Sequence, residues 1–167
     1  MSIDPTGRRE TRDFGEAVVF DRRFRAPIED VWASITDSDR LERWVGVWEG
    51  DPASGGVVFR MTAEGDDVAP EAVTIYECAP PRLLRMRIGG NDGDSGQFEL
   101  TLVESNGVTT LTFAQSAQSD HPIADVAPGW EYYLDRLVAD HGGADVASVD
   151  FDDYYPSMCE HYREMFA

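Results

Sequence analysis

VAPGWEYYLDRLVADH, residues Val126–His141, is the one long segment in the C-terminal half with the pattern of an amphipathic helix. Pro128 suits the first turn, because the N–H that proline lacks would have no partner there. Gly142 and Gly143 follow and end the helix, since glycine readily adopts a positive φ. Apolar residues recur at helical spacing on one face, and charged residues occupy the other. The apolar face comprises Trp130, Tyr133, Leu134, Leu137 and Val138, and the polar face comprises Glu131, Asp135, Arg136 and Asp140.

This helix needs a sheet to cover its apolar face. Its 16 residues would span about 24 Å, close to the roughly 23 Å of a seven-residue strand. Upstream, six segments alternate in the period of strands, and Asn106-Gly107 is a strong hairpin signal. Short turns between successive strands predict an α+β fold with an antiparallel meander. The predicted strands are residues 17–25, 57–62, 72–78, 83–88, 97–104 and the segment carrying Leu111 and Phe113, with two short helices at residues 27–35 and 39–44 after the first strand.

The length of 167 residues suits one domain with a single core. We expect a flexible leader at residues 1–15, the domain at 16–143 and an extension at 144–167. In that extension Pro156 would open a short helix with an apolar stripe that packs on the domain or on a second subunit, which makes a homodimer possible. The stripe comprises Tyr155, Cys159, Tyr162 and Phe166. No apolar run approaches the roughly 20 residues of a membrane span, and no signal-peptide pattern opens the chain, so a cytoplasmic protein without membrane insertion is predicted.

The charge is strongly negative. Thirty-two acidic residues face 14 basic ones, all of them arginine, which gives a net charge of −18. Such a field repels nucleic acid and anionic membranes. Because the acids are scattered, solubility or adaptation to salt explains them better than a docking surface for a basic partner. Cys78 and Cys159 lie far apart without a CxxC pattern, which favours buried free thiols.

Three segments carry a family resemblance. They are FRAPIEDVWASITDSDRLERW (residues 24–44), PPRL (80–83) and the Gly129-Trp130…Leu134-Asp135-Arg136-Leu137 helix. Their order along the chain resembles the START-related SRPBCC superfamily, most closely the branch named after the activator of heat-shock-protein-90 ATPase. The resemblance covers about residues 17–141 and implies a helix-grip fold, in which a curved sheet wraps the long helix around an apolar cavity. Members bind lipids, polyketides or other hydrophobic small molecules, and some are cyclases.

A cavity of this kind would be lined from both sides. Strand residues on the inner faces would meet the apolar face of the helix, with Trp44 and Trp48 near the mouth. Methionine and aromatic side chains suit a pocket that adapts to varied apolar ligands. Periodicity alone does not distinguish such a pocket from a filled core. The candidate ligand-binding residues are Trp44, Trp48, Phe59, Met61, Ile75, Met86, Phe98, Leu100, Phe113, Gln115, Trp130, Tyr133, Leu134 and Leu137.

Some polar residues fall on inner positions. Arg22 interrupts the apolar face of the first strand, and exposure through a strand twist is favoured over burial, since a buried charge needs a partner. Gln115 continues the inner face of the last strand, and the hydroxyls of Tyr76 and Tyr133 could also reach the interior. A cyclase would need a general acid or base, for which Glu77, Tyr133 or Arg22 could be recruited.

Other chemistry finds little support in the sequence. No GxSxG motif, phosphate loop or dinucleotide fingerprint is present, so no catalytic residue and no cofactor is predicted. Asp120, His121 and Asp125 could supply metal ligands, but they lack a ligand spacing such as HxxxH, and a solvated loop is favoured. The leading hypothesis is a binding protein for a hydrophobic or aromatic small molecule. The alternatives are a polyketide cyclase or dehydratase and a cochaperone-type interaction module.

Overall fold

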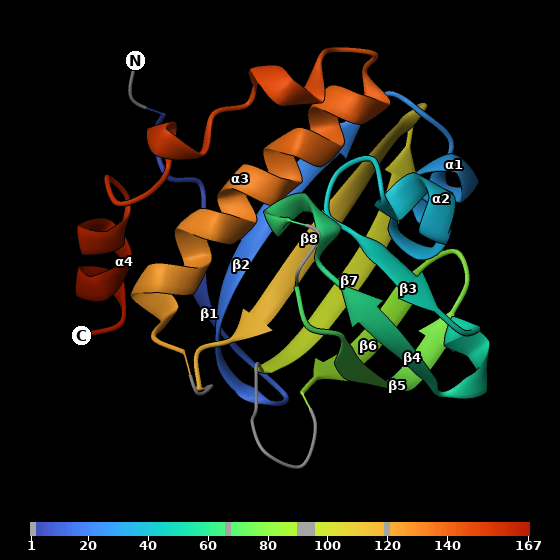
Figure 1. Cartoon of the computed structure of the whole chain (residues 1–167), viewed down its shortest axis with the longest axis horizontal. Helices are drawn as coiled ribbons and strands as arrows, with labels where there is room; N and C mark the ends of the chain where they lie inside the picture. Colours follow the sequence, from blue (N-terminus) through green and yellow to red (C-terminus); the bar gives the residue numbers. More distant parts are fainter. Residues whose placement is uncertain (1–2, 66–67, 90–95, 119–120) are drawn as a thin grey trace.

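An eight-stranded antiparallel sheet curves around one long helix in the computed structural model of the chain (Figure 1). The structure describes residues 3–65, 68–89, 96–118 and 121–167. The strand order is β1-β2-β8-β7-β6-β5-β4-β3. The α+β class and the helix-grip arrangement implied by the resemblance are therefore confirmed. The strands are β1 (Arg8–Arg12), β2 (Gly15–Phe24), β3 (Val47–Glu49), β4 (Gly56–Arg60), β5 (Glu71–Ala79), β6 (Leu83–Ile88), β7 (Gly96–Ser105) and β8 (Val108–Ser116).

The sheet has two strands more than the six predicted. β1 lies within the expected flexible leader and pairs antiparallel with β2, with Arg8 opposite Val19. Its sequence, RRETR, contains no apolar residue, so it lacks the alternation that marks a half-buried strand. β3 has only three residues, too few for a period of two to be recognised. The β7–β8 hairpin is as predicted, with Asn106 and Gly107 at φ of 54° and 78°.

Four α-helices accompany the described strands. α1 (Ile28–Thr36) and α2 (Ser38–Leu41) follow β2 as predicted, and the Asp37 carboxylate caps α2 by accepting from the Asp39 N–H at 3.0 Å. α3 (Ile123–His141) begins three residues earlier than predicted, so Pro128 lies inside it and not in its first turn. α4 is Cys159–Met165.

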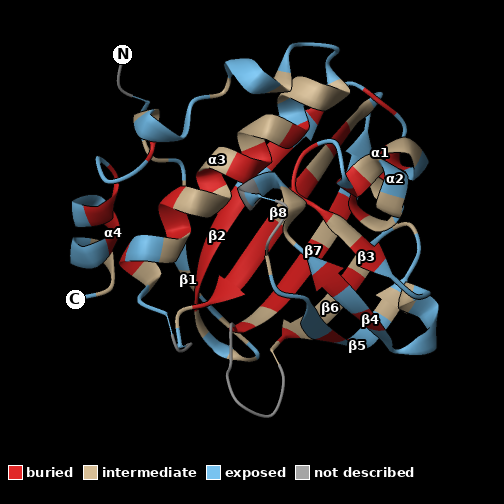
Figure 2. Ribbon diagram, viewed as in Figure 1, coloured by how far each residue is buried: buried red, intermediate tan, exposed pale blue. Residues whose placement is uncertain are grey.

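The main core lies between the concave face of the sheet and α3, where the buried residues gather in Figure 2. Val18, Phe20 and Phe24 project from β2 into this core, as the alternation predicted. On the opposite face of β2, Val19 is also fully buried, in a small separate cluster with Ala17 and Ala114. The first strand is therefore covered on both faces over part of its length.

Arg22 belongs to the inner face of β2, and only 8% of it is exposed. Its guanidinium donates to the carboxylates of two α3 residues, Glu131 (Nη2–Oε1 3.0 Å) and Asp135 (Nε–Oδ1 2.9 Å). The prediction that Arg22 is solvent-exposed is wrong. So is the placement of Glu131 on the polar face of the helix, because Glu131 is 1% exposed. The carboxylates supply the partners that a buried guanidinium needs.

Both ends of the chain join this cluster. The Tyr162 hydroxyl donates to Glu131 at 2.6 Å, and the Tyr154 hydroxyl donates to Asp135 at 2.6 Å. The backbone N–H of Thr6 donates to Glu131 at 2.7 Å, and the Thr6 hydroxyl also contacts this carboxylate. Burial, together with these hydrogen bonds to carboxylates, raises the pKa of both tyrosines above its ordinary value. We call Thr6, Arg22, Glu131, Asp135, Tyr154 and Tyr162 the carboxylate cluster.

The C-terminal extension packs on the domain of its own chain. Tyr154, Met158 and Tyr162 are at most 2% exposed and belong to the main core, and Figure 1 shows α4 beside α3. This is one of the two predicted positions, and the homodimer stays a prediction. α4 begins at Cys159 and not at Pro156, because residues 154–158 form turns.

Candidate functional site

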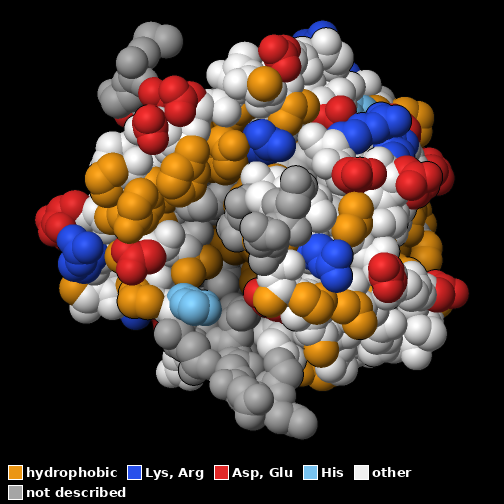
Figure 3. All heavy atoms as spheres, in the orientation of Figure 1, with side chains coloured by type: hydrophobic (Ala, Val, Ile, Leu, Met, Phe, Trp, Pro, Cys, Tyr) orange, Lys and Arg blue, Asp and Glu red, His pale blue; other side chains and the backbone are white. Residues whose placement is uncertain are grey.

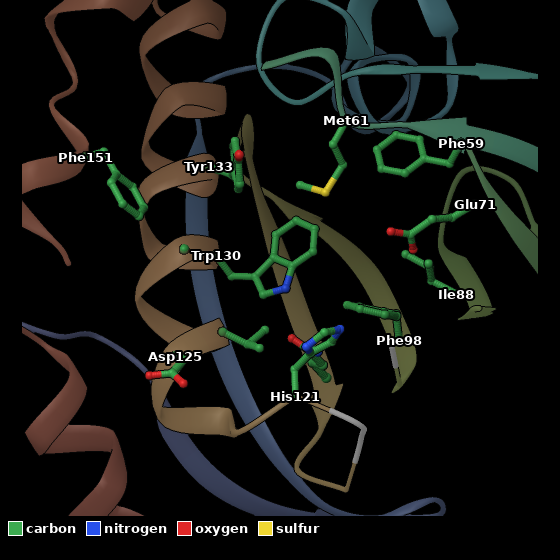
Figure 4. Close-up of a pocket in the computed structure, with 13 residues that line it drawn as sticks. Phe59, Met61, Glu71, Ile88, Phe98, His121, Asp125, Trp130, Tyr133 and Phe151 are labelled. Carbon is green, nitrogen blue, oxygen red and sulfur yellow. The ribbon is translucent and has the colours of Figure 1, made fainter. Parts of the chain in front are cut away.

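A cavity of about 370 Å³ lies between the first half of α3 and one end of the concave sheet face. β4 and β6 end there and β5 and β7 begin there. Figure 3 shows hydrophobic side chains on both sides of this hollow, and Figure 4 shows Trp130 projecting from α3 toward the strands. The described lining residues are Phe59, Met61, Glu71, Ile88, Phe98, Gln115, His121, Asp125, Val126, Gly129, Trp130, Tyr133 and Phe151.

The helix side of the cavity follows from helical spacing. Asp125, Gly129 and Tyr133 are four residues apart, as are Val126 and Trp130, so both rows lie on neighbouring lines of one helix face. Gly129 leaves room at the middle of this face: a Cβ added there would meet no atom of the described chain within 4 Å. The absence of this side chain helps to keep the cavity open.

The sheet side is built from strand pairs in register. Phe98 on β7 lies opposite Gln115 on β8, and Phe59 on β4 lies opposite Glu71 on β5. Residues directly opposite in an antiparallel pair point to the same face, so all four contribute to the concave face. Trp130 from α3 stands edge-on to Phe98, with ring centroids 5.7 Å apart. Sheet and helix therefore meet in aromatic contacts at the inner wall of the cavity.

A second, small void of about 40 Å³ adjoins the cavity and shares Phe59, Ile88 and Trp130 with it. Trp44 and Trp48 line this deeper void. They are 3% and 7% exposed, and their indole N–H groups donate to the backbone carbonyls of Ser34 and Thr36, both at 2.9 Å. Their predicted position near the mouth is wrong, because these hydrogen bonds hold both rings in the interior.

The structure divides the predicted ligand-binding residues into three groups. Leu134, Leu137 and Ile75 are buried and line neither space, so they are core residues. Of these two spaces, Trp44, Trp48, Met86, Leu100 and Phe113 line the small void and not the cavity. The larger cavity brings together Phe59, Met61, Phe98, Gln115, Trp130 and Tyr133.

Sequence reasoning missed several lining residues. Glu71 had a signal, because it continues the inner-face alternation of Val73 and Ile75 by one more step. Val126 and Gly129 had the signal of helical spacing to Trp130 and Tyr133. Phe151 had none, since it comes from the C-terminal extension, whose packing the sequence left open.

Three residues proposed for chemistry lie elsewhere. Tyr76 is 53% exposed, so its hydroxyl does not reach the interior. Glu77 is also exposed and lies 3.6 Å from the Arg85 guanidinium outside the cavity. Arg22 is held in the carboxylate cluster. Of Glu77, Tyr133 and Arg22, which were considered for acid or base chemistry, the cavity therefore contains Tyr133 alone. Two further titratable residues line it, His121 and Glu71.

No metal centre is formed by the described residues. His121 and Asp125 both line the cavity, Asp120 lies outside the described residues, and no group of three possible ligands occurs in the described ranges. Cys78 and Cys159 are free thiols as predicted, although only Cys159 is fully buried. Burial raises the pKa of both thiols, and neither lines the cavity.

Family comparison agrees with this architecture. Residues 25–141 match the model of the family described as activator of Hsp90 ATPase homolog 1-like proteins. The chain belongs to this family. The match begins next to Phe24 and ends with α3, so it covers the sheet and helix that form the cavity in this AHSA1-like protein. The first two strands and the extension that carries Phe151 lie largely outside it.

Solved structures show the same fold. CalU16 from Micromonospora echinospora is 26% identical, with a TM-score of 0.66 over 97% of this chain and 92% of that one. EF2215 from Enterococcus faecalis, a conserved protein of unknown function, is 17% identical, with a TM-score of 0.70 over 96% of this chain and 90% of that one. DynU16, a protein in the dynemicin biosynthetic locus, is 21% identical, with a TM-score of 0.57 over 78% of this chain and 49% of that one.

No functionally curated protein matches this AHSA1-like chain. Among the described residues, no helix combines the length and apolar character needed to cross a bilayer.

Proposed function

We propose that this AHSA1-like protein binds a hydrophobic or aromatic small molecule in the cavity between α3 and the sheet. The observation that carries the proposal is the cavity of about 370 Å³. Small-molecule sites usually have volumes of about 300–1,000 Å³, with apolar and aromatic walls and a few polar groups. Trp130, Phe98 and Phe59 supply such walls, and Gln115 and Tyr133 supply polar groups among them.

Sequestration would be the mechanism. A ligand would enter at the end of the sheet where β6 ends and β7 begins. It would then be buried against Trp130. Each square ångström of apolar surface removed from water contributes about 25 cal/mol before ordering costs. Shape and apolar area would therefore dominate affinity, and no covalent step is required.

A cyclase or dehydratase is the second candidate. An enzyme of this kind would bring histidine, arginine and tyrosine together inside the cavity, and His121 and Tyr133 do line it. Arginine is missing from the described lining residues, which favours binding over catalysis. DynU16 shares the fold and lies in a biosynthetic locus, which is compatible with either role. A cochaperone-type module is suggested by the family description alone. A cytoplasmic location remains a prediction.

Native mass spectrometry of the purified chain is the first test. A copurified apolar ligand would appear as a discrete mass above that of the protein. In parallel, the protein would be titrated with Prodan, a neutral naphthalene dye whose emission shifts to the blue in apolar sites. We expect saturable binding of one dye per chain. No saturable Prodan binding together with no copurified ligand would contradict the proposal.

Gly129 allows a sharper version of this test. A Cβ at this position meets no atom of another described element within 4 Å, so the side chain of Gly129→Leu should extend into the cavity. We expect it to weaken Prodan binding at least about tenfold, which corresponds to a loss of about 1.4 kcal/mol. Gly129→Ala is the graded control. It should retain most of the binding and stabilise α3 by about 0.5–1 kcal/mol. Equal binding by both variants would place the dye elsewhere.

A further inference from the structure

The charge of the cavity lining is one-sided. Glu71 and Asp125 contribute carboxylates, His121 contributes an imidazole, and no arginine is among the described lining residues of this lysine-free chain. Asp125 has a structural reason to be acidic, because it lies in the first turn of α3, where the macrodipole favours negative charge. Glu71 lies at the start of a strand, where no helix macrodipole favours its charge, and its side chain is accessible to solvent at the rim of the cavity.

Glu71 occupies an inward-facing register position. It lies opposite Phe59, and it alternates along β5 with the buried Val73 and Ile75. A side chain at such a position normally belongs to the apolar face of the strand. In Figure 4 its carboxylate points toward the space in front of Trp130. Among the described residues, none forms a side-chain hydrogen bond or salt bridge with the Glu71 carboxylate, which is exposed to solvent.

An aromatic wall faces this carboxylate. Trp130 projects into the cavity, with Phe98 beside it and Tyr133 one turn further along α3. Tryptophan is the aromatic side chain that attracts cations most strongly through its ring face. A carboxylate facing tryptophan, at the rim of an apolar cavity, is complementary to a ligand with an apolar body and one positive charge. The net charge of −18 acts in the same direction, since it attracts cations and repels anions at long range.

We propose that the ligand class is aromatic or apolar molecules that carry a protonated amine, with Glu71 as the residue that selects the charge. This inference rests on the proposed binding function and specifies it. Anionic amphiphiles such as fatty acids would be disfavoured, because their carboxylate would lie against Glu71 with no arginine from the described lining to compensate. Neutral ligands would bind with intermediate affinity.

Three matched probes test this inference: 1-naphthylmethylamine, 1-naphthylmethanol and 1-naphthoic acid, which are cationic, neutral and anionic at pH 7. Their dissociation constants would be measured by calorimetry at 20 mM and 300 mM NaCl. At low salt we expect the amine to bind about five- to tenfold more tightly than the alcohol, as one ion pair plus one cation–π contact would give. The acid should bind most weakly. The preference for the amine should shrink at high salt.

Glu71→Gln should remove most of the amine preference and leave the affinity for the alcohol unchanged. Glu77→Gln is the matched control, since it removes the same charge from an exposed site on β5 outside the cavity. A wild-type protein that binds the alcohol or the acid as tightly as the amine would overturn the inference but not the proposed function. Equal effects of the two variants would overturn the role of Glu71. Failure of all three probes to bind would overturn the proposed function as well.

Discussion

Arg22 shows how one residue can determine the packing of distant segments. Its guanidinium is paired with Glu131 and Asp135, and both carboxylates also accept hydrogen bonds from the C-terminal extension. Removing one partner of a buried pair leaves the other charge uncompensated, which usually costs about 3–5 kcal/mol. The cluster therefore makes the domain depend on contacts that lie far apart in the sequence.

Arg22→Met should lower the free energy of unfolding by about 3–5 kcal/mol, because Glu131 would remain buried with one charge uncompensated. Urea denaturation followed by circular dichroism measures this loss. Arg8→Met is the control. Arg8 also forms a salt bridge, with Asp21 at 2.7 Å, but both side chains are 44% exposed, so the loss should stay within about 1 kcal/mol. Similar losses in the two variants would contradict a special role for the cluster.

Tyr162 predicts the response to alkaline pH. Its folded-state pKa is raised by burial and by the hydrogen bond to Glu131, whereas its unfolded pKa is about 10. The unfolded chain therefore loses this proton first as the pH rises. The contribution of Tyr162 to the free energy of unfolding is constant below about pH 9 and falls above about pH 10. The slope is about 1.4 kcal/mol per pH unit for each such tyrosine. The pKa of Tyr154 is raised in the same way, and burial raises the pKa of both thiols, so the wild-type slope should exceed that of one tyrosine.

Tyr162→Phe should lower stability at pH 7 and reduce the alkaline slope between pH 10 and 11 by about 1.4 kcal/mol per pH unit. The chain has no lysine, so tyrosine and cysteine are the side chains that titrate in this range, and the two thiols contribute equally in wild type and variant. Tyr76→Phe, at a position that is 53% exposed, should leave the slope unchanged. Chemical denaturation at half-unit pH steps provides the measurement. An unchanged slope in Tyr162→Phe would rule out this source of the pH dependence.

Residue-level prediction from the sequence failed where a polar residue has a distant partner. The strand pattern placed Arg22 on the buried face of β2, but its partners lie 109 and 113 positions further along the chain. Glu131 was placed on the exposed face of the helix because it is a charged residue, whereas it is buried against Arg22 and Tyr162. Glu71 was predictable by alternation with Val73, yet a charge on an inner face has no explanation until the cavity is seen. Local pattern gives the direction of a side chain and not its partners.

At the level of elements, the C-terminal extension is part of the domain. Tyr154, Met158 and Tyr162 add three core side chains and two donors to the carboxylate cluster. Truncation after Gly143 should therefore lower stability by more than about 4 kcal/mol, because each buried side chain contributes about 1.5–3 kcal/mol. Urea denaturation measures the loss, and size-exclusion chromatography detects aggregation. Tyr155→Ala, at a position that is 37% exposed, is the mild control.

The alternative position of the extension, in a dimer contact, predicts a different outcome. The full-length chain would then elute as a dimer, and the truncated chain would be a stable monomer. We expect a full-length monomer and a truncated protein that unfolds or aggregates.

Elements with strong local signals were predicted well. β4 to β8, α1 and α2 carry clear alternation, a cap or a hairpin turn, and each was found close to its predicted range. α3 was found as well, but Pro128 misplaced its start, because proline in the second turn was taken as a first-turn signal. β1 has no apolar residue and is defined only by its hydrogen bonds to β2. Elements that depend on a neighbour for their structure leave no local pattern.

For the whole molecule, the net charge of −18 predicts the response to salt. Ordinary repulsion among surface charges is screened by about 0.15 M salt, where the Debye length is about 8 Å. A chain adapted to high salt should instead continue to gain thermal stability between 0.5 M and 3 M NaCl. Differential scanning calorimetry across this range separates the two. We expect the melting temperature to keep rising, and a plateau above 0.2 M would assign the acidity to solubility alone.

The carboxylate cluster also has a consequence for folding during translation. Thr6 and Arg22 leave the ribosome early, while their acceptor Glu131 and its partner Tyr162 are among the last quarter of the residues to be made. At about 5–20 residues per second, Arg22 waits roughly 5–20 s for Glu131 to be synthesised. Contacts of such long sequence separation also slow folding itself. The nascent chain can therefore complete its native structure only when translation is nearly finished.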